Sequence, residues 1–374
     1  MSDPLLLSAH GLATCAVGNS EPNPRVGCVI AALDGRTMGE GSTQRAGAPH
    51  AEVMALQSAE DAGHDPRGAT AYVTLEPCSH HGRTPPCCDA LIEAGIAKLV
   101  IAVQDPNPRV AGRGIERLRA AGIEVTVLAP DDPAAIASRE LNIGFFSRMI
   151  RKRPWLRMKI AASLDGRTAL ENGASQWITG EAARLDGHAF RKRAGAVLTG
   201  IGTVQGDDPR LDVRLVATGV QPKRVVVDSR LEISLAARIL QPPGEVLVYT
   251  AAAPAGAAAD KAQQLAALGV TVVPCPGVGG KVDLAAMLDD LARREVNELH
   301  VEAGHKLNGS FVKAGLVDEF LLYLAPTLLG LGREMVHFGP LTDLAGGVSL
   351  AYQSVERVGD DLRVIARPPG RADF

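Results

Sequence analysis

His50-Ala51-Glu52, followed by Pro77-Cys78 and then by Cys87, is the stretch that decides the fold of the N-terminal part of this 374-residue chain. One histidine and two thiolates supply three zinc ligands and leave a fourth coordination position for water, whereas structural zinc sites close with four protein ligands. Glu52 stands two residues after the histidine and is free to carry protons. The set therefore predicts a catalytic zinc site with His50, Cys78 and Cys87 as the metal ligands.

Local patterns place these ligands at the ends of secondary-structure elements. Cys78 is expected to follow a strand, and His50 and Cys87 are each expected to stand where a helix begins. The partial positive charge of a helix N-terminus favours the thiolate form of Cys87. Zinc lowers the pKa of its water to about 7, and Glu52 as the catalytic residue would pass that proton to leaving ammonia. The pattern therefore predicts hydrolytic deamination.

The remaining cysteines are interpreted differently. Cys88 competes with Cys87 as a ligand, although two adjacent helical side chains point about 100° apart. Cys15, Cys28 and Cys275 are interpreted as packing residues. Only three ligands are then expected.

The step from Cys78 to Cys87 is longer than in the commoner Pro-Cys-x-x-Cys form of this motif. The residues between them are expected to form an inserted loop beside the metal. His80 and Arg83 in this loop are candidates for binding a phosphate or sugar of the substrate, and a merely solvated basic loop is the alternative.

The composition argues against a nucleic-acid-binding protein. The net charge is −3 and aromatic residues make up 3% of the chain, whereas a nucleic-acid surface would need a basic face and stacking rings. We therefore expect a small-molecule substrate and no nucleic acid.

The run Leu5-Leu6-Leu7 follows Asp3 and is interpreted as part of an amphipathic helix rather than a signal peptide. With no apolar run near the roughly 20 residues that cross a bilayer, we expect a cytoplasmic protein without membrane contact.

Two α/β domains are predicted, because 374 residues with 46% hydrophobic content exceed one ordinary core. A long helix over Ala134–Met149 is expected to end before Pro154, which places the boundary between domains 1–150 and 151–374. The N-terminal strands are predicted at Val26–Ala31, Ala69–Leu75, Leu99–Val103 and Val125–Leu128, with helices at Ala51–Ala62, Cys88–Ala94 and Gly114–Ala121. The C-terminal strands are predicted at Trp155–Ala162, Ala196–Thr199, Arg224–Asp228, Val246–Thr250, Val270–Val273, Glu298–Glu302 and Glu319–Leu324, with a surface helix within Ala251–Leu268.

Polar residues of the second half suggest a second site. Gly304–Ser310 is predicted to be a flexible turn between a strand and a helix, which suits a pyrophosphate group. Arg191 and Arg214 could clamp a substrate phosphate, because a guanidinium matches phosphate geometry. Ser229, at a strand end, could contact a 2′-phosphate. Lys159 and Asp165 are expected to line this site.

Longer segments resemble a known family. They are Thr74–Cys87, His50–Val53 and Gln104–Pro108 in the first half, and Lys159–Thr168, Ser175–Thr179, Gly206–Pro209 and Val301–Gly304 in the second. Together they resemble the bifunctional deaminase/reductases of riboflavin biosynthesis over nearly the whole chain. The resemblance implies a cytidine-deaminase-like α/β/α sandwich followed by a dihydrofolate-reductase-like α/β domain.

The resemblance also implies two consecutive reactions on one phosphorylated pyrimidine, the first with Zn²⁺ and the second with NADPH. The implied NADPH contacts are Ala161, Trp177, Thr203, Asp207, Ser229, Gly304, His305, Lys306, Leu307, Asn308, Gly309 and Ser310. The implied substrate contacts are Ser175, Arg191, Leu211, Arg214 and Glu302. Further candidates for substrate contact are Asn23, His80, Arg83, Asn107, Lys159 and Asp165. We further expect a homo-oligomer, whose copy number the sequence does not set.

One position departs from the family pattern: Thr43 stands seven residues before His50, where the family commonly has histidine. Threonine can donate a hydrogen bond but cannot carry charge, so substrate affinity is expected to change and zinc ligation is expected to stay the same.

Three alternative functions stay open. They are a deaminase with a non-catalytic C-terminal domain, a nucleic-acid-editing deaminase and a structural zinc protein.

Overall fold

The computed structural model describes residues 3–82 and 84–374, and its contacts divide the chain into two compact units. The first unit ends at Lys152 and also includes the C-terminal Phe374, and the second is Arg153–Asp373. Helix α6 (Ile143–Arg151) runs past residue 150, where the sequence pattern placed the boundary. No helix in the described ranges is long and apolar enough to cross a membrane.

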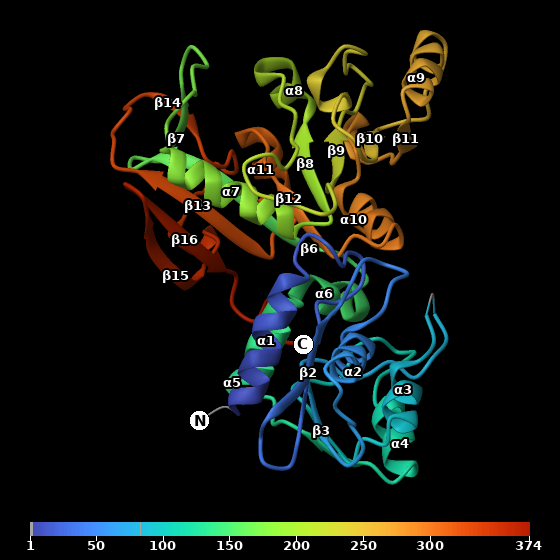
Figure 1. Ribbon diagram of the computed structural model, residues 1–374. Helices are drawn as coiled ribbons and strands as arrows, with labels where there is room; N and C mark the ends of the chain where they lie inside the picture. Colours follow the sequence, from blue (N-terminus) through green and yellow to red (C-terminus); the bar gives the residue numbers. More distant parts are fainter. Residues whose placement is uncertain (1–2, 83) are drawn as a thin grey trace. The chain divides into compact units, whose positions relative to one another are not determined.

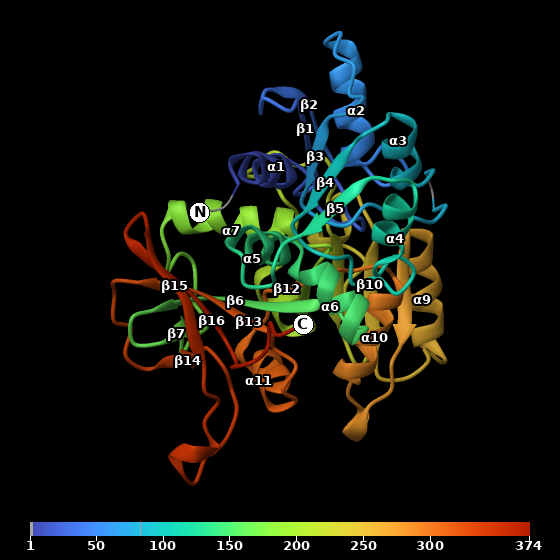
Figure 2. The ribbon, with the colours of Figure 1, turned by 90° about the horizontal axis from the view of Figure 1, so that it is seen from below.

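The N-terminal unit, shown in Figure 1, is built on a five-stranded sheet of order β2-β1-β3-β4-β5, whose strands are all labelled in Figure 2. Its strands are β1 (Gly27–Ala31), β2 (Thr37–Ser42), β3 (Thr70–Val73), β4 (Lys98–Ile101) and β5 (Glu124–Val127), and its helices before α6 are α1 (Pro4–Cys15), α2 (Ala51–Asp61), α3 (Cys87–Glu93), α4 (Arg113–Ala120) and α5 (Pro133–Leu141). Strand β1 is antiparallel to both neighbours, and β3, β4 and β5 are parallel.

Helices cover both faces of this sheet. On one face α1 and α5 contribute Leu6 and Ala134 to a small cluster with Val100. On the other face a larger core joins the sheet to side chains of α2, α3, α4 and α6. The unit is an α/β/α sandwich, as the sequence predicts.

Two glycines bring α2 close to the sheet. A Cβ atom on Gly39 would lie 2.2 Å from the carbonyl oxygen of Ala55, and one on Gly41 would lie 2.3 Å from that of Ala51. Only glycine permits this approach. The close contact holds the first turn of α2, and with it His50, against the edge of the sheet.

The single helix predicted over Ala134–Met149 is wrong, because α5 ends at Leu141 and α6 begins at Ile143. Asn142 separates them with φ of −107°. Its side chain accepts a hydrogen bond from the backbone N–H of Arg25 at 2.7 Å and donates to the Arg25 carbonyl at 2.9 Å. This buried pairing with another segment competes with helix continuation.

The C-terminal unit contains a nine-stranded sheet of order β11-β10-β9-β8-β12-β6-β13-β16-β15 (Figure 1). The strands of this sheet are β6 (Trp155–Ser163), β8 (Ala196–Gly200), β9 (Lys223–Val227), β10 (Val246–Thr250), β11 (Val270–Pro274), β12 (Glu298–Val301), β13 (Glu319–Ala325), β15 (Ala351–Val358) and β16 (Asp361–Arg367). A separate ribbon pairs β7 (Arg167–Leu170) with β14 (Gly332–Glu334). The helices are α7 (Glu181–Arg193), α8 (Ile201–Asp207), α9 (Ala257–Ala267), α10 (Leu284–Arg293) and α11 (His305–Lys313).

The first seven strands in this order, from β11 to β13, are parallel to one another. The last two, β16 and β15, extend the sheet as an antiparallel hairpin. The main core packs α10 and α11 on one face, through residues such as Leu288 and Phe311. Val204 of α8 and Leu265 of α9 pack into a second core with Val197 of β8, whose side chain faces the opposite way from that of Leu198. The sheet is therefore covered on both faces, which makes the carboxyl ends of its parallel strands the expected place for a ligand.

All the strands predicted from sequence are present, with ends shifted by one or two residues. Strands β2, β7, β14, β15 and β16 were not predicted. Glycines at positions 39 and 41 interrupt the hydrophobic alternation in β2. In β15 the side chains are mostly exposed, so burial imposes no apolar pattern on them.

Candidate functional site

His50, Cys78 and Cys87 come together in the N-terminal unit. Their ligand atoms all lie within 4.8 Å of one another. Nδ1 of His50 is 3.3 Å from Sγ of Cys87 and 3.7 Å from Sγ of Cys78. Tetrahedral zinc with bonds of about 2.0–2.3 Å requires donor separations of about 3.5–3.8 Å, so these three side chains fit the metal.

Helix N-termini set the electrostatics of this cluster. His50 caps α2 and Cys87 is the first residue of α3. The backbone N–H of Cys87 donates to Sγ of Cys78 at 3.3 Å. Hydrogen bonds from Cys87 lower the pKa of the Cys78 thiol and so favour the thiolate that zinc needs, and the Cys78 interaction raises the pKa of His50.

Glu52 lies in the first turn of α2 and is only 3% exposed. Burial raises the pKa of its carboxyl, the Cys78 thiolate adds to that effect, and His50 opposes it. A carboxyl group with a raised pKa beside a metal cluster is suited to accept a proton and then release it.

The other predicted contacts of this unit lie in loops. His80 is half-buried, and its Nδ1 is a buried atom without a hydrogen-bond partner among the described residues. The N–H of Asn23 donates to the Ser20 carbonyl at 2.8 Å, and that of Asn107 donates to Oδ1 of Asp105 at 2.7 Å. Arg83 lies outside the described residues.

Thr43, at the position where the family commonly has histidine, is buried. Its hydroxyl accepts from the N–H of Val26 at 3.1 Å, just before β1 begins. The shorter side chain is thus held by the backbone.

Two carboxylates beside the metal cluster were missed by the sequence analysis. Glu76, two residues before Cys78, accepts hydrogen bonds from four backbone N–H groups and is 3% exposed. Burial raises the pKa of Asp105 to about 7, and the charges of Glu76 and Cys78 contribute. Both residues lie inside motif segments and directly precede a proline, which could have drawn attention to them.

The other cysteines are thiols outside the cluster. Sγ of Cys88 donates to the carbonyl of Pro77 at 3.4 Å, so Cys88 points away from the ligand set. Cys28 and Cys275 are buried, as expected of packing residues. The expectation for Cys15 is wrong: it is exposed, because it lies outside the face of α1 that buries Leu6, Ala9 and Ala13.

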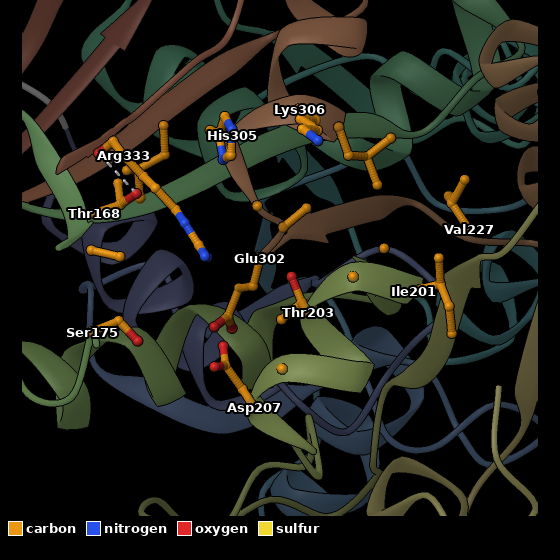
Figure 3. A pocket seen from close by; sticks show the side chains of 18 of the residues that line it. Thr168, Ser175, Ile201, Thr203, Asp207, Val227, Glu302, His305, Lys306 and Arg333 are labelled. Carbon is orange, nitrogen blue, oxygen red and sulfur yellow. Dashed lines mark hydrogen bonds between the residues drawn. The ribbon is translucent and has the colours of Figure 1, made fainter. Parts of the chain in front are cut away.

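A pocket of about 1380 Å³ opens in the C-terminal unit (Figure 3). It lies where β8, β9 and β12 end, at Gly200, Val227 and Glu302. Sites for drug-sized ligands occupy about 300–1000 Å³. This pocket therefore has room for a dinucleotide together with a second molecule.

Most of the predicted NADPH contacts line this pocket: Ala161, Trp177, Thr203, Asp207, Ser229, Gly304, His305, Lys306, Leu307 and Ser310. In Figure 3, Thr203 and Asp207 of α8 lie on the same side as Glu302, while His305 and Lys306 come from α11. The flexible turn predicted over Gly304–Ser310 is wrong, because Gly304 caps α11 and the rest of the segment is helix.

Asn308 and Gly309 are on the side of α11 that packs on its own unit. Nδ2 of Asn308 donates to the Met335 carbonyl at 3.1 Å, and a Cβ on Gly309 would lie 1.9 Å from the His337 carbonyl oxygen. Both are buried. They position the helix and do not line the pocket.

Lys159, Ser175 and Glu302 line the pocket, and Glu302 is held by a network of charges. Its carboxylate receives two hydrogen bonds from Arg191, at 2.5 Å from Nε and 2.9 Å from Nη2, and Nζ of Lys159 is 4.0 Å away. Although burial opposes it, this network holds the pKa of Glu302 well below its usual value. Burial lowers the pKa of Lys159.

Several predicted substrate contacts are committed to other partners. Of the two residues predicted to clamp a phosphate, Arg191 pairs with Glu302 and Arg214 donates to Asp212 at 2.7 Å; the clamp stays a prediction. The Asp165 carboxylate accepts from the N–H groups of Leu329 and Gly330 instead of lining the pocket. Leu211 is buried in a hydrophobic core.

Pocket residues missed by the sequence analysis include Arg184 and Arg333. The Arg184 guanidinium stands 4.7 Å from the ring centroid of Trp177. Nearby, His188 accepts from the N–H of Arg214 at 3.2 Å, and burial lowers the pKa of His188 to about 4. No sequence signal marks these residues, since single basic residues on surface segments are common.

A metal cluster of catalytic type in one unit, and a dinucleotide-sized pocket at the strand ends of the other, define a zinc deaminase joined to a reductase. Residues 4–103 match the cytidine and deoxycytidylate deaminase zinc-binding region, and residues 154–364 match the RibD C-terminal domain. The chain belongs to the RibD family, the bifunctional deaminase/reductases of riboflavin biosynthesis. Its cofactors are zinc in the deaminase part and NADPH in the reductase part.

Similarity extends over the full length of relatives. The chain is 43% identical to the riboflavin biosynthesis protein RibD of Escherichia coli, covering 92% of this chain and 93% of the relative, and 40% identical to that of Aquifex aeolicus, covering 95% of each. The structure of Acinetobacter baumannii RibD superimposes with a TM-score of 0.87 at 40% identity, covering 97% and 98% of the two chains. A Thermotoga maritima structure, described as a diaminohydroxyphosphoribosylaminopyrimidine deaminase/5-amino-6-(5-phosphoribosylamino)uracil reductase, gives 0.85 at 34% identity, covering 97% of each chain.

Proposed function

We propose that this chain acts twice on one phosphorylated pyrimidine. It first replaces the 2-amino group of 2,5-diamino-6-ribosylamino-4(3H)-pyrimidinone 5′-phosphate with oxygen, adding water and releasing ammonia. It then reduces the ribosyl group of the product to ribityl, which gives 5-amino-6-ribitylamino-uracil 5′-phosphate. The observation that carries the proposal is the presence of both sites in one chain: the His50, Cys78 and Cys87 cluster beside Glu52, and the pocket lined by Glu302.

In the deaminase domain, residues 1–150, His50, Cys78 and Cys87 would hold zinc. The metal supplies hydroxide near neutral pH by lowering the pKa of bound water to about 7. Glu52 takes up the proton and releases it to the leaving amino group. His80 and Asn107, with Asn23 and Arg83, contact the substrate. Nδ1 of His80, which is buried and has no hydrogen-bond partner among residues 3–82 and 84–374, supports this role, since a buried polar atom requires a partner.

In the reductase domain, residues 151–374, NADPH would lie across the carboxyl ends of β8, β9 and β12. It supplies the hydride. Gly304 at the N-terminus of α11 and Ser229 after β9 bind its phosphates. Lys159, Ser175 and Glu302 face the substrate, and Arg191 fixes the Glu302 carboxylate.

We place the protein in the cytoplasm, because none of its six cysteines, all of them described, is in a disulfide, as is usual for a reducing compartment. Nucleic acid and membrane have no part in the proposed reaction. A homo-oligomer is supported by the edge strand β15, where Tyr352 is 76% exposed and Val355 is 55% exposed. An edge strand that exposes apolar side chains such as these is suited to cover by a second copy. Sedimentation of the purified protein would report the copy number.

Glu52→Gln tests the deaminase assignment. The amide cannot shuttle the proton, so turnover of the diaminopyrimidine should fall by about 10²- to 10⁴-fold, while zinc content stays at one per chain. Zinc is measured by elemental analysis and deamination by ammonia release. Glu60→Gln, an exposed position on the same helix, serves as the control. Near-normal turnover in Glu52→Gln would refute the assigned role.

A further inference from the structure

Glu76 connects two parts of the deaminase domain, the segment that carries Cys78 and the segment 105–115. It follows β3 and precedes the zinc ligand Cys78 by two residues. Its Oε2 accepts from the N–H groups of Asp105 at 3.2 Å and Gly112 at 3.0 Å. Its Oε1 accepts from those of Gly114 at 3.0 Å and Ile115 at 3.3 Å. One buried carboxylate thus pairs with four backbone donors of a segment some thirty residues away in sequence.

The donors explain why the residue is acidic. Helix α4 has Gly112 as its N-cap, which offers no side chain to satisfy the first backbone N–H groups. Those groups carry a partial positive charge and need acceptors. Glu76 supplies them from another segment and also binds the N–H of Asp105, where the preceding loop begins. The loop 105–112 is therefore held at both of its ends by one side chain.

Packing adds to this connection. A Cβ atom on Gly114 would lie 2.3 Å from the Pro77 carbonyl oxygen, so the start of α4 lies directly against the peptide that precedes Cys78. The thiol of Cys88 donates to the carbonyls of both Pro77 and Gly114, at 3.4 and 3.7 Å. The loop and the metal-bearing corner thus form one packed body.

We propose that Glu76 is a positioning residue of the deaminase, which fixes the loop 105–112 in register with the zinc ligand Cys78. The loop carries Asn107, whose contact with the pyrimidine belongs to the function proposed above, and the inference rests on that function. Glu76 touches no substrate in this role. It affects the reaction by fixing the position of Asn107 relative to the metal.

Glu76→Gln in the full-length protein tests the proposal. The amide keeps the size of the side chain, but its NH₂ group faces two backbone donors whichever way it is turned, so two of the four hydrogen bonds are lost. The expected result is a KM for the diaminopyrimidine at least about tenfold higher, with a smaller change in kcat, one zinc per chain and an unchanged reductase reaction. Asn107→Ala should raise KM similarly, and the double variant should show little further increase, because both changes remove one contact. Glu116→Gln, exposed on α4, is the matched control.

Unchanged KM and kcat in Glu76→Gln would overturn the proposal. Loss of zinc in proportion to loss of activity would also overturn it, because Glu76 would then support only the zinc ligand Cys78. Additive effects of Glu76→Gln and Asn107→Ala would also overturn it. A wild-type protein without deaminase activity would instead refute the proposed function. If Glu76→Gln does not fold, amide hydrogen exchange of the wild type decides: Asp105, Gly112, Gly114 and Ile115 should be protected as one group, and rapid, independent exchange would contradict the role.

Discussion

The two sites of this protein are built in opposite ways. The deaminase site consists of four side chains from three short segments, and three of them place their donor atoms within 4.8 Å. The reductase pocket draws its lining from residues between Lys159 and Arg333, over a volume of about 1380 Å³. In the first, specific side chains at helix starts define the site. In the second, backbone at strand ends and an ion-pair network define it.

The difference shows what each cofactor requires of a chain. A metal ion needs a few donors of fixed type at short distance, so changing one should abolish the site. A dinucleotide is held by many weak contacts, so changing one should weaken binding without abolishing it. Mutations in the two units should therefore differ in the size of their effects.

The largest effect is expected for Cys87→Ser. Loss of a ligand removes both the metal and its water, so deamination should fall by more than the roughly 10²- to 10⁴-fold that proton transfer alone contributes. The reductase should still convert deaminated intermediate supplied to it, measured by NADPH oxidation at 340 nm.

Cys15→Ser, at an exposed thiol, is the control for that experiment. Loss of both activities in a folded Cys87→Ser protein would show that the two sites are coupled. That result would contradict the interpretation that the metal site and the reductase pocket work independently.

The same contrast explains what the sequence could predict. The spacing of His50, Cys78 and Cys87 sufficed for the metal cluster, because His50 and Cys87 begin helices that local patterns also predict. Arg191 could be singled out by its type, but its pairing with Glu302 joins residues more than a hundred positions apart and leaves no local trace. Glu76 lies within a recognised motif, yet its four partners lie in the loop 105–112 and the first turn of α4, whose position only the fold determines. The break at Asn142 has the same origin, since its partner is Arg25.

A smaller effect is expected from His188, a buried residue of α7 whose Nε2 lies 3.4 Å from Nη1 of Arg191. Its folded pKa of about 4 is below the usual 6.5, chiefly through burial and then through Arg191 and Arg214; Asp212 and Glu302 oppose the shift. The unfolded chain therefore binds a proton that the folded chain does not, and stability should fall as pH falls from about 6.5 to about 4, by at most about 1.4 kcal/mol per pH unit. Denaturant unfolding of His188→Asn against wild type measures it: the advantage of the wild type should shrink over this range, and a constant difference would contradict the assignment.

The smallest effect is expected for Arg184→Gln. Its guanidinium lies over the exposed Trp177 ring and its Nη1 donates to the Thr179 carbonyl at 2.8 Å. A cation–π contact at an exposed site is worth about 0.5–1 kcal/mol, so NADPH should bind about two- to fivefold more weakly. Quenching of tryptophan fluorescence by NADPH measures this, with Lys192→Gln on the same helix as the control. Complete loss of binding would contradict the picture of many weak contacts.

The central claim is that one chain carries two sites that act in succession on one substrate. The most direct measurement follows the diaminopyrimidine phosphate by mass spectrometry, with and without NADPH, before and after zinc is removed by a chelator. We expect deaminated intermediate alone without NADPH, the ribityl product with NADPH, and unchanged substrate after zinc removal. Reduction of the substrate by the zinc-free protein, or intermediate that accumulates unreduced in the presence of NADPH, would contradict it.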